Sequence, residues 1–170
     1  MRRSILYIAY LMVSVYCFDS SNYAACQTQF MDSVLTEHGS LANIDCENIN
    51  PGVVTGGKIC NQIGFQYYEN GDDANAITCY KKAIALSPEY PIPLNNLGAV
   101  YLKSNKLELA RECFSKAIIL NPEYVKAICN LAVVSYIMGD LEAAKQLYQK
   151  AKRIDSAYVE QRIANYIKHH

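Results

Sequence analysis

The sequence predicts an all-α fold, a right-handed α-solenoid of stacked helical hairpins, and two observations carry that prediction. First, one pattern recurs at an interval of 34 residues, as "NQIGFQYYENG" at 61–71, "NNLGAVYLKSN" at 95–105 and "CNLAVVSYIMG" at 129–139. Second, apolar residues within each copy recur at three- and four-residue steps, the spacing of a helix with one buried face. Such repetition is typical of solenoids, in which neighbouring units cover one another's apolar faces.

Length and charge narrow the classes of function. The chain has 170 residues, 51% of them hydrophobic, with 16 basic and 16 acidic side chains. This length suits one domain with a real core. Zero net charge argues against nucleic acid as the main partner, because phosphate binding requires an excess of Lys and Arg on one face.

The N-terminal segment has the layout of a secretory signal peptide. Arg2 and Arg3 precede a short apolar run, and polar residues begin at Asp19. The run is shorter than the roughly 20 residues of a membrane-spanning helix. We therefore predict a signal peptide at residues 1–17 and an exported protein, periplasmic or secreted. An uncleaved anchor and a lipid-modified cysteine are the alternatives, and either would place the protein at a membrane.

Residues 18–56 are expected to form a helix followed by an irregular segment that contains cysteines. Leader removal leaves six of the seven cysteines, and an even count in an exported protein suggests disulfides. A Cys26–Cys46 bridge would tie this segment down, and a Cys113–Cys129 bridge would join adjacent helices. The alternative for each repeat cysteine is a small buried apolar residue. No Cys-x-x-Cys pair or Cys/His cluster occurs, so we predict neither a metal nor another cofactor.

The three copies span residues 57–90, 91–124 and 125–158, and each reads as two helices joined by a turn. Asn and Gly in these turns suit the residue that ends the first helix. Small residues at one matched position let the paired helices approach closely, and aromatic residues at another fill the gap toward the following repeat. These two sets are Gly64, Gly98 and Ala132, and Tyr80, Phe114 and Tyr148.

Together, the 34-residue period, the "LGAVY" run at 97–101, the matched alanines, the aromatic and the closing proline resemble the tetratricopeptide repeat. The resemblance covers residues 57–158. The third copy departs from the family pattern at Ser135 and Ser156, where tyrosine and proline would stand. Residues 159–170 resemble the family's capping helix, with Val159 on its apolar face.

Stacked hairpins curve, so the first helix of each copy is expected to line an inner groove. The predicted groove residues are Lys58, Asn61, Gln62, Phe65, Asn95, Asn96, Lys103, Lys126, Asn130 and Val133. Among them, Gln62, Asn96 and Asn130 are equivalent, and their amides offer donors and acceptors to a peptide backbone. Some members of the family hold peptides with an Asn ladder of this kind. The alternative is that these amides tie adjacent helices together or stay solvated.

No arrangement typical of catalysis is present, because neither a Gly-x-Ser-x-Gly nor a Walker sequence occurs. We therefore predict no enzyme, but a scaffold or adaptor whose partner is an extended protein or peptide segment. Only Asn96 and Lys126 match the five positions of the family's chaperone-tail clamp, which argues against a tail-specific co-chaperone. The alternatives are a structural assembly factor of a membrane-associated complex and a small cytosolic secretion chaperone; the leader argues against the latter.

Overall fold

Seven α-helices make up residues 55–169, the part of the chain that this computed structural model describes. They are α3 (Gly56–Glu69), α4 (Asp73–Leu86), α5 (Pro91–Lys103), α6 (Leu107–Leu120), α7 (Val125–Ile137), α8 (Leu141–Ile154) and α9 (Ser156–His169). This range contains no β-strand, so the predicted all-α class is confirmed. The predicted leader, Cys26 and Cys46 lie outside the described residues.

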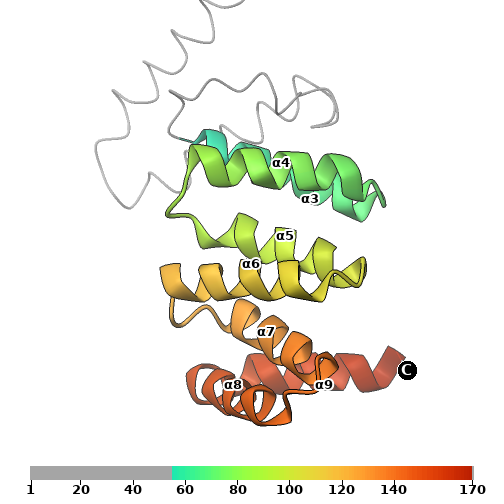
Figure 1. Cartoon of the computed structure of the whole chain (residues 1–170), viewed down its shortest axis with the longest axis vertical. Coiled ribbons are helices and arrows are strands. Elements are labelled where there is room, and N and C mark those ends of the chain that lie inside the picture. Colours follow the sequence, from blue (N-terminus) through green and yellow to red (C-terminus); the bar gives the residue numbers. More distant parts are fainter. Residues whose placement is uncertain (1–54, 170) are drawn as a thin grey trace, which may run out of the picture. The chain divides into compact units, whose positions relative to one another are not determined.

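The helices pack as consecutive hairpins. Within hairpins, α3 packs against α4, α5 against α6 and α7 against α8, while contacts between α4 and α5 and between α6 and α7 join neighbouring hairpins. Figure 1 shows this stacking, with α9 beside α8 at the C-terminal end. Contacts of α5 with both α3 and α7 place the first helices in one layer, which we call the inner layer. None of the helices between residues 55 and 169 combines the length and apolarity needed to cross a bilayer.

The turn inside each hairpin has the same backbone conformation. Gly71, Asn105 and Gly139 are equivalent, and their φ angles are positive, at 81°, 56° and 85°. After the first of them, the backbone N–H of Asp72 donates to the carbonyl of Tyr67 at 2.8 Å, and the equivalent bonds of the other turns are 2.8 and 2.9 Å. This pattern is the Schellman ending of a helix, which favours glycine and, less strongly, asparagine at the left-handed position.

Glycines on α3 and α5 let an aromatic ring of the second helix lie against the backbone. A Cβ added to Gly64 would lie 2.9 Å from the Tyr80 ring, and one added to Gly98 would lie 2.7 Å from the Phe114 ring. Both rings are buried, at 1% and 0% exposure. The close approach of paired helices therefore depends on these glycines, because the rings fill the space that a side chain would occupy.

The hydrophobic core lies between hairpins as much as within them. Its largest cluster draws on α4, α5, α6 and α7, and contains Ala76, Tyr80, Leu97, Val100, Tyr101, Ala110, Cys113, Phe114 and Val134. A smaller cluster joins α7 and α8 to α9 through Ile128, Cys129, Ala151 and Val159. Each hairpin therefore completes its core with side chains of its neighbours, as expected for a repeat array.

The structure corrects the predicted Cys113–Cys129 bridge, because both thiols are free and buried. Cys113 packs beside Phe114 in the largest cluster, whereas Cys129 packs beside Val159 in the cluster under α9. The two side chains face different parts of the core, so a disulfide would require the backbone to move. Burial raises the pKa of the Cys113 thiol to about 11, which suits a small apolar residue better than a reactive one.

The C-terminal helix begins at Ser156, whereas the sequence analysis starts the capping helix at residue 159. The first two copies have proline at the position of Ser156 and make a turn before the next helix begins. In the third copy, the Asp155 carboxylate accepts the backbone N–H of Tyr158 at 2.9 Å, and the helix starts at once. Val159 is 2% exposed, so the start of α9 covers the last hairpin.

Candidate functional site

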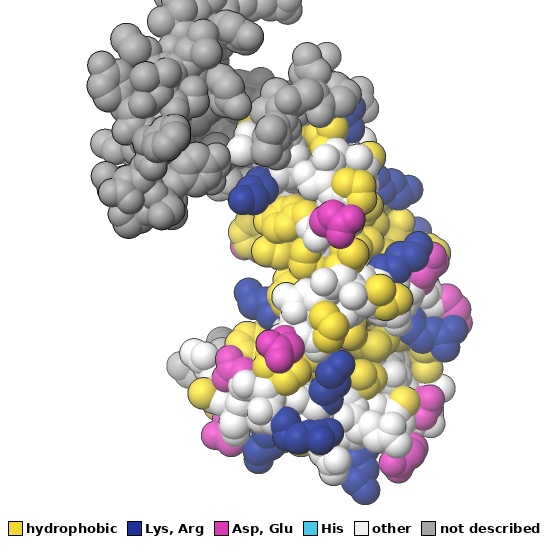
Figure 2. All heavy atoms as spheres, turned by 90° about the vertical axis from the view of Figure 1, so that its left-hand side faces the viewer, with side chains coloured by type: hydrophobic (Ala, Val, Ile, Leu, Met, Phe, Trp, Pro, Cys, Tyr) yellow, Lys and Arg dark blue, Asp and Glu magenta, His cyan; other side chains and the backbone are white. Residues whose placement is uncertain are grey.

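The inner layer and the loops that precede its helices enclose an open pocket of about 670 Å³, which we call the inner groove. Its lining residues are Lys58, Asn61, Gln62 and Phe65 of α3, Tyr90, Ile92 and Asn96 at α5, Tyr124, Val125 and Lys126 at α7, and Asp155 and Tyr158 at α9. Figure 2 shows the ends of the helices at which the α4–α5 and α6–α7 loops lie, with hydrophobic side chains gathered between scattered charged ones. The groove therefore combines apolar and polar lining.

Three tyrosines occupy equivalent positions in the inner groove, at the end of each 34-residue copy: Tyr90, Tyr124 and Tyr158. The backbone N–H of each of the first two donates to the carbonyl three residues earlier, at 3.0 Å. That of Tyr158 donates instead to the Asp155 carboxylate. All three side chains are half-buried, so one similarly placed phenol ring lines the groove at each step along the array.

Burial controls the protonation of Tyr90 and Tyr124. It raises the pKa of Tyr124 to about 12, and the charge that Tyr90 or Tyr158 would carry when ionised raises that pKa as well. Burial also raises the pKa of Tyr90. The hydroxyls of Tyr90 and Tyr124 therefore stay protonated at neutral pH and can act as hydrogen-bond donors.

A continuous series of side-chain hydrogen bonds, which we call the amide chain, runs from α9 to α3. Arg162 Nη2 donates to Asn130 Oδ1 at 2.6 Å, and Asn130 Nδ2 donates to Asn95 Oδ1 at 2.9 Å. Asn95 Nδ2 then donates to Asn96 Oδ1 at 3.3 Å, and Asn96 Nδ2 to Asn61 Oδ1 at 3.0 Å. Every carbonyl oxygen in this series accepts a bond from within the protein. The amide chain therefore links α3, α5, α7 and α9 through their polar side chains.

The three equivalent amides singled out in the sequence have different environments. Gln62 is exposed in the groove, Asn96 both lines the groove and belongs to the amide chain, and Asn130 is 9% exposed within that chain. Asn96 bonds to Asn61, and Asn130 bonds to Asn95, 35 residues earlier in each case. Each partner therefore lies one residue before the equivalent position in the preceding repeat. Tying adjacent helices together is thus what Asn130 does here, while Gln62 faces the open groove.

Six predicted groove residues line the inner groove: Lys58, Asn61, Gln62, Phe65, Asn96 and Lys126. Phe65 is 48% exposed, although phenylalanine is among the residues most often fully buried. The other four are absent from the lining. Asn95 and Asn130 are buried in the amide chain, and Val133 lies farther along α7 at 40% exposure.

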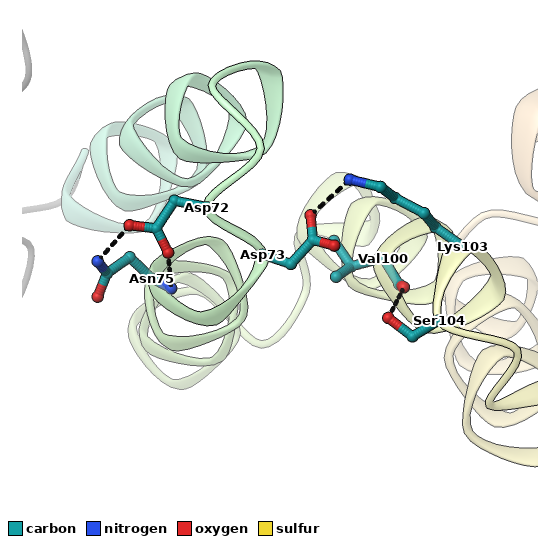
Figure 3. Close-up of polar contacts among 6 residues, drawn as sticks. All are labelled: Asp72, Asp73, Asn75, Val100, Lys103 and Ser104. Atoms are coloured by element: carbon teal, nitrogen blue, oxygen red, sulfur yellow. Dashed lines mark hydrogen bonds and ion pairs between the residues drawn. The ribbon is translucent and has the colours of Figure 1, made fainter.

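Lys103, the fourth, joins the first two hairpins. Its ammonium group lies 2.9 Å from an Asp73 carboxylate oxygen and 5.1 Å from the centroid of the Tyr68 ring. Figure 3 shows Lys103 reaching from the end of α5 to the start of α4. The hydrogen bond to Asp73 raises the pKa of Lys103, which keeps it charged and engaged in this contact.

Part of the groove lining comes from loops that the sequence did not indicate. Tyr90, Tyr124 and Asp155 precede helices of the structure, whereas the groove was expected on the first helix of each copy. A signal for the tyrosines was present, because tyrosine ends all three copies at the 34-residue interval. These loops face the inner groove because each second helix packs on the next hairpin.

Family models match most of the described region. A model described as "TPR repeat" matches residues 64–105, and models described as "Tetratricopeptide repeat" match residues 91–124 and 125–158. Together they span residues 64–158, which is more than half of the 170-residue chain.

Two similar solved structures contain a bound peptide. The second TPR of Spaghetti (RPAP3) bound to HSP90 peptide SRMEEVD is 26% identical, with a TM-score of 0.57 over 58% of this chain and 92% of that one. The second TPR domain of human RPAP3 in complex with HSP70 peptide SGPTIEEVD is 25% identical, with a TM-score of 0.57 over 64% of this chain and 88% of that one.

A curated relative matches only locally. Photosystem I assembly protein Ycf3 of Prochlorococcus marinus (strain NATL2A) is 35% identical over 51 residues, which is 30% of this chain and 30% of that protein. The match therefore spans less than a third of that relative's length.

Proposed function

Because the chain belongs to the tetratricopeptide repeat family, we propose that it is an interaction scaffold that holds an extended peptide segment of a partner protein in the inner groove. The family fold typically serves as a non-enzymatic scaffold. The observation that carries the proposal is the inner groove itself, about 670 Å³ in volume and lined from every repeat. An extended segment suits it, because the lining continues from α3 to α9.

Side chains along the groove supply both anchoring and orienting contacts. Phe65 offers a half-exposed ring, and Ile92 and Val125 add apolar lining. Gln62, Lys58 and the tyrosines provide hydrogen-bonding groups beside this apolar surface. Apolar anchors with a few convergent polar groups are typical of ligand sites in proteins. We expect an affinity on the order of micromolar, because few charges line the groove.

Comparison with solved structures supports this proposal. The two RPAP3 repeat domains described above hold short peptides, and their sequences are 26% and 25% identical to this chain. Their peptides end in Glu-Glu-Val-Asp. For this chain we propose the peptide-holding role without that tail preference, because Asn130 is buried in the amide chain where the family's clamp has arginine.

To test this proposal, peptides that bind the full chain are selected from a displayed random library, and their affinity is measured by calorimetry. We expect Phe65→Ala to weaken binding about ten-fold, because an aromatic side chain that a partner buries commonly supplies at least that much. Ile119→Ala is the matched control, since Ile119 is 77% exposed on α6 and absent from the groove lining. Selected peptides that bind Phe65→Ala and the unchanged chain equally would contradict the groove proposal.

A second candidate is a structural assembly factor that uses a surface outside the groove. It is favoured by exposed apolar residues on α7 and at the start of α8: Val133, Tyr136, Ile137 and Leu141, at 40%, 67%, 50% and 62% exposure. Neighbouring exposed apolar side chains often mark interaction sites. In that case Ile137→Lys should abolish partner association while Phe65→Ala leaves it unchanged, which reverses the outcome expected for the groove.

We also propose that the scaffold works in an exported compartment. Support comes from the sequence of residues 1–17 alone, which has a basic head, an apolar run and a polar exit. The intact mass of the protein from its native host decides this proposal. A mass lacking about 17 residues supports export, whereas a full-length mass with free thiols favours the cytosolic secretion chaperone or the anchored form.

A further inference from the structure

We propose that the segment held in the inner groove is proline-rich and adopts the polyproline II conformation, with the rings and hydroxyls of Tyr90, Tyr124 and Tyr158 as its docking sites. This inference rests on the proposed peptide-binding function and adds the chemical class of the peptide. It comes from two observations, the balance of hydrogen-bond donors and acceptors in the groove and the period of its tyrosines.

Four acceptor oxygens of the inner groove already accept hydrogen bonds from the protein itself. The carbonyl oxygens of Asn61 and Asn96 accept bonds within the amide chain. The Tyr158 hydroxyl oxygen accepts from Arg162 Nη1 at 3.4 Å, and the Asp155 carboxylate accepts the Tyr158 N–H at 2.9 Å. The amide oxygens of Asn61 and Asn96 thus face other groups of the protein, while the Asn61 amide N–H groups and the Tyr158 O–H are left to donate to a ligand.

Donors, by contrast, remain available to a ligand. Between residues 55 and 169, no hydrogen bond engages the hydroxyl of Tyr90 or Tyr124, and no buried side-chain nitrogen or oxygen lacks a partner. The two hydroxyls therefore reach solvent in the groove. Lys58 and Lys126 also line the inner groove, and no ion pair engages either of them between residues 55 and 169. The exposed lining residues that offer a free acceptor are Gln62, with its carbonyl oxygen, and Asp155, with its second carboxylate oxygen, so free donors still outnumber free acceptors.

A proline-rich backbone matches this surplus of donors. Proline presents a carbonyl acceptor but has no N–H, so its burial in a groove poor in acceptors leaves no donor unpaired. An ordinary extended backbone would bring N–H groups that find few partners there, and an unpaired buried N–H weakens binding. Prolines also dock on aromatic rings in the recognition modes that use polyproline II segments.

The spacing of the tyrosines fits the same conformation. Direct side-chain bonds join α3 to α5 and α5 to α7, and the axes of helices packed side by side are typically about 8–10 Å apart. A polyproline II helix advances about 9 Å per three-residue turn. One tyrosine per repeat therefore meets one turn of the ligand. The lysines of the groove do not recur in every repeat. Lys58 and Lys126 occupy equivalent positions in the first and third repeats, but the second repeat has Ile92 there.

The test titrates the full chain with a labelled oligoproline peptide about ten residues long, which spans the three tyrosines. A peptide of equal length made of alternating alanine and glutamine, and the acidic peptide SRMEEVD, are titrated in parallel. We expect oligoproline to bind at least about ten-fold more tightly than either. Tyr124→Phe should weaken it about five-fold, because only the hydroxyl donor is lost. Tyr136→Phe, on the exposed face of α7 outside the groove lining, should change nothing.

The other outcomes distinguish the proposed peptide-binding function from the proline inference. If the alanine–glutamine or acidic peptide binds as tightly as oligoproline, and Phe65→Ala weakens it, the proposed function stands and the proline inference is overturned. If no peptide binds the folded chain, both proposals fail. If oligoproline binds equally to Tyr90→Phe, Tyr124→Phe and the unchanged protein, the tyrosines are not its docking sites. Circular dichroism confirms that the Tyr→Phe variants fold, since each keeps its ring.

Discussion

The middle repeat, residues 91–124, and the last repeat, residues 125–158, match the same pattern but are packed differently. In the middle repeat the aromatic residue Phe114 is 0% exposed, whereas its equivalent Tyr148 in the last repeat is 37% exposed. The whole of α8 has one buried residue, Ala151, while α6 has four. How much a residue of the repeat pattern stabilises the fold therefore depends on how far neighbouring helices bury it. The second helix of the last repeat is buried less than that of the middle repeat.

The difference follows from what lies beyond each second helix. The next hairpin packs on α6 through α7, and the largest cluster includes Val134 from that side. By contrast, α9 covers the last hairpin at Ala151 and Val159, which lie near the end of α8 and the start of α9. The first half of α8, including Leu141 at 62% exposure, remains open among the described residues. The last repeat thus resembles an array end more than an array interior.

The largest predicted effect contrasts the two aromatic positions. Phe114→Ala should lower the free energy of unfolding by about 3–5 kcal/mol, because it empties a fully buried site at the centre of the largest cluster. Tyr148→Ala should lower it less, by about 1–2 kcal/mol, since that residue is 37% exposed and buries less apolar area. Urea unfolding followed by circular dichroism measures both. Equal losses would show that the two repeats are equally packed.

The second prediction concerns the polar link from the last repeat to α9. Asn130→Ala removes the acceptor of Arg162 Nη2 and the donor to Asn95, which is 6% exposed. A loss of about 1–3 kcal/mol is expected, because buried polar groups would be left without partners. Gln62→Ala is the matched control at the equivalent exposed position, and its urea midpoint should not change. If both variants lose the same stability, the amide chain does not stabilise the fold.

The sequence was sufficient for the fold because its information is local and repeated. Helical periodicity, the turn residues Gly71 and Gly139 and the small residues at Gly64 and Gly98 each specify one feature of a hairpin, and the feature recurs in the structure. The amide chain could not be predicted from the sequence, for a physical reason. Its end depends on Arg162 of α9 meeting Asn130, and that meeting is decided by how α9 docks rather than by any period.

The candidate site was predictable in part for a similar reason. Residues on the first helices, such as Lys58 and Phe65, follow from the helical face that must turn inward. Lys103 shares that face, but the nearby Asp73 and Tyr68 engage it outside the groove lining. Tyr90 and Tyr124 lie in loops just before a helix, where periodicity does not indicate the direction of a side chain. In both loops the tyrosine N–H donates to the carbonyl three residues earlier, so the two loops share one local backbone arrangement.

The third prediction exchanges one methyl group between the two repeats. Gly98→Ala places a Cβ 2.7 Å from the Phe114 ring, which has no room to move, and should cost about 1–3 kcal/mol. Alanine already stands at the equivalent Ala132, in the repeat whose aromatic residue, Tyr148, is more exposed. There, Ala132→Gly should cost only about 1 kcal/mol, the helix-propensity difference. A stabilising Gly98→Ala in urea unfolding would contradict the close packing described for the middle repeat.

The smallest predicted effect concerns the N-terminus of the second helix, where the middle repeat is the less stabilised one. Its helix α6 lacks the side-chain cap that α4 and α8 have. Asp72 and Asp140 cap α4 and α8, with carboxylate oxygens that accept backbone N–H groups at 3.1 and 3.0 Å, and Figure 3 shows the first of these caps. Lys106 stands at the equivalent position of α6 without a side-chain cap, although its backbone angles, φ −91° and ψ 70°, lie close to those of Asp72, φ −86° and ψ 74°. Lys106→Asp should therefore raise the free energy of unfolding by about 0.5–2 kcal/mol, whereas Lys106→Ala should not raise it, because only aspartate supplies the missing acceptor. An equal gain from both variants in urea unfolding would attribute the effect to removal of the lysine instead. A gain confined to aspartate would show that packing by both neighbours lets the middle repeat tolerate a helix start that the other two repeats stabilise with aspartate.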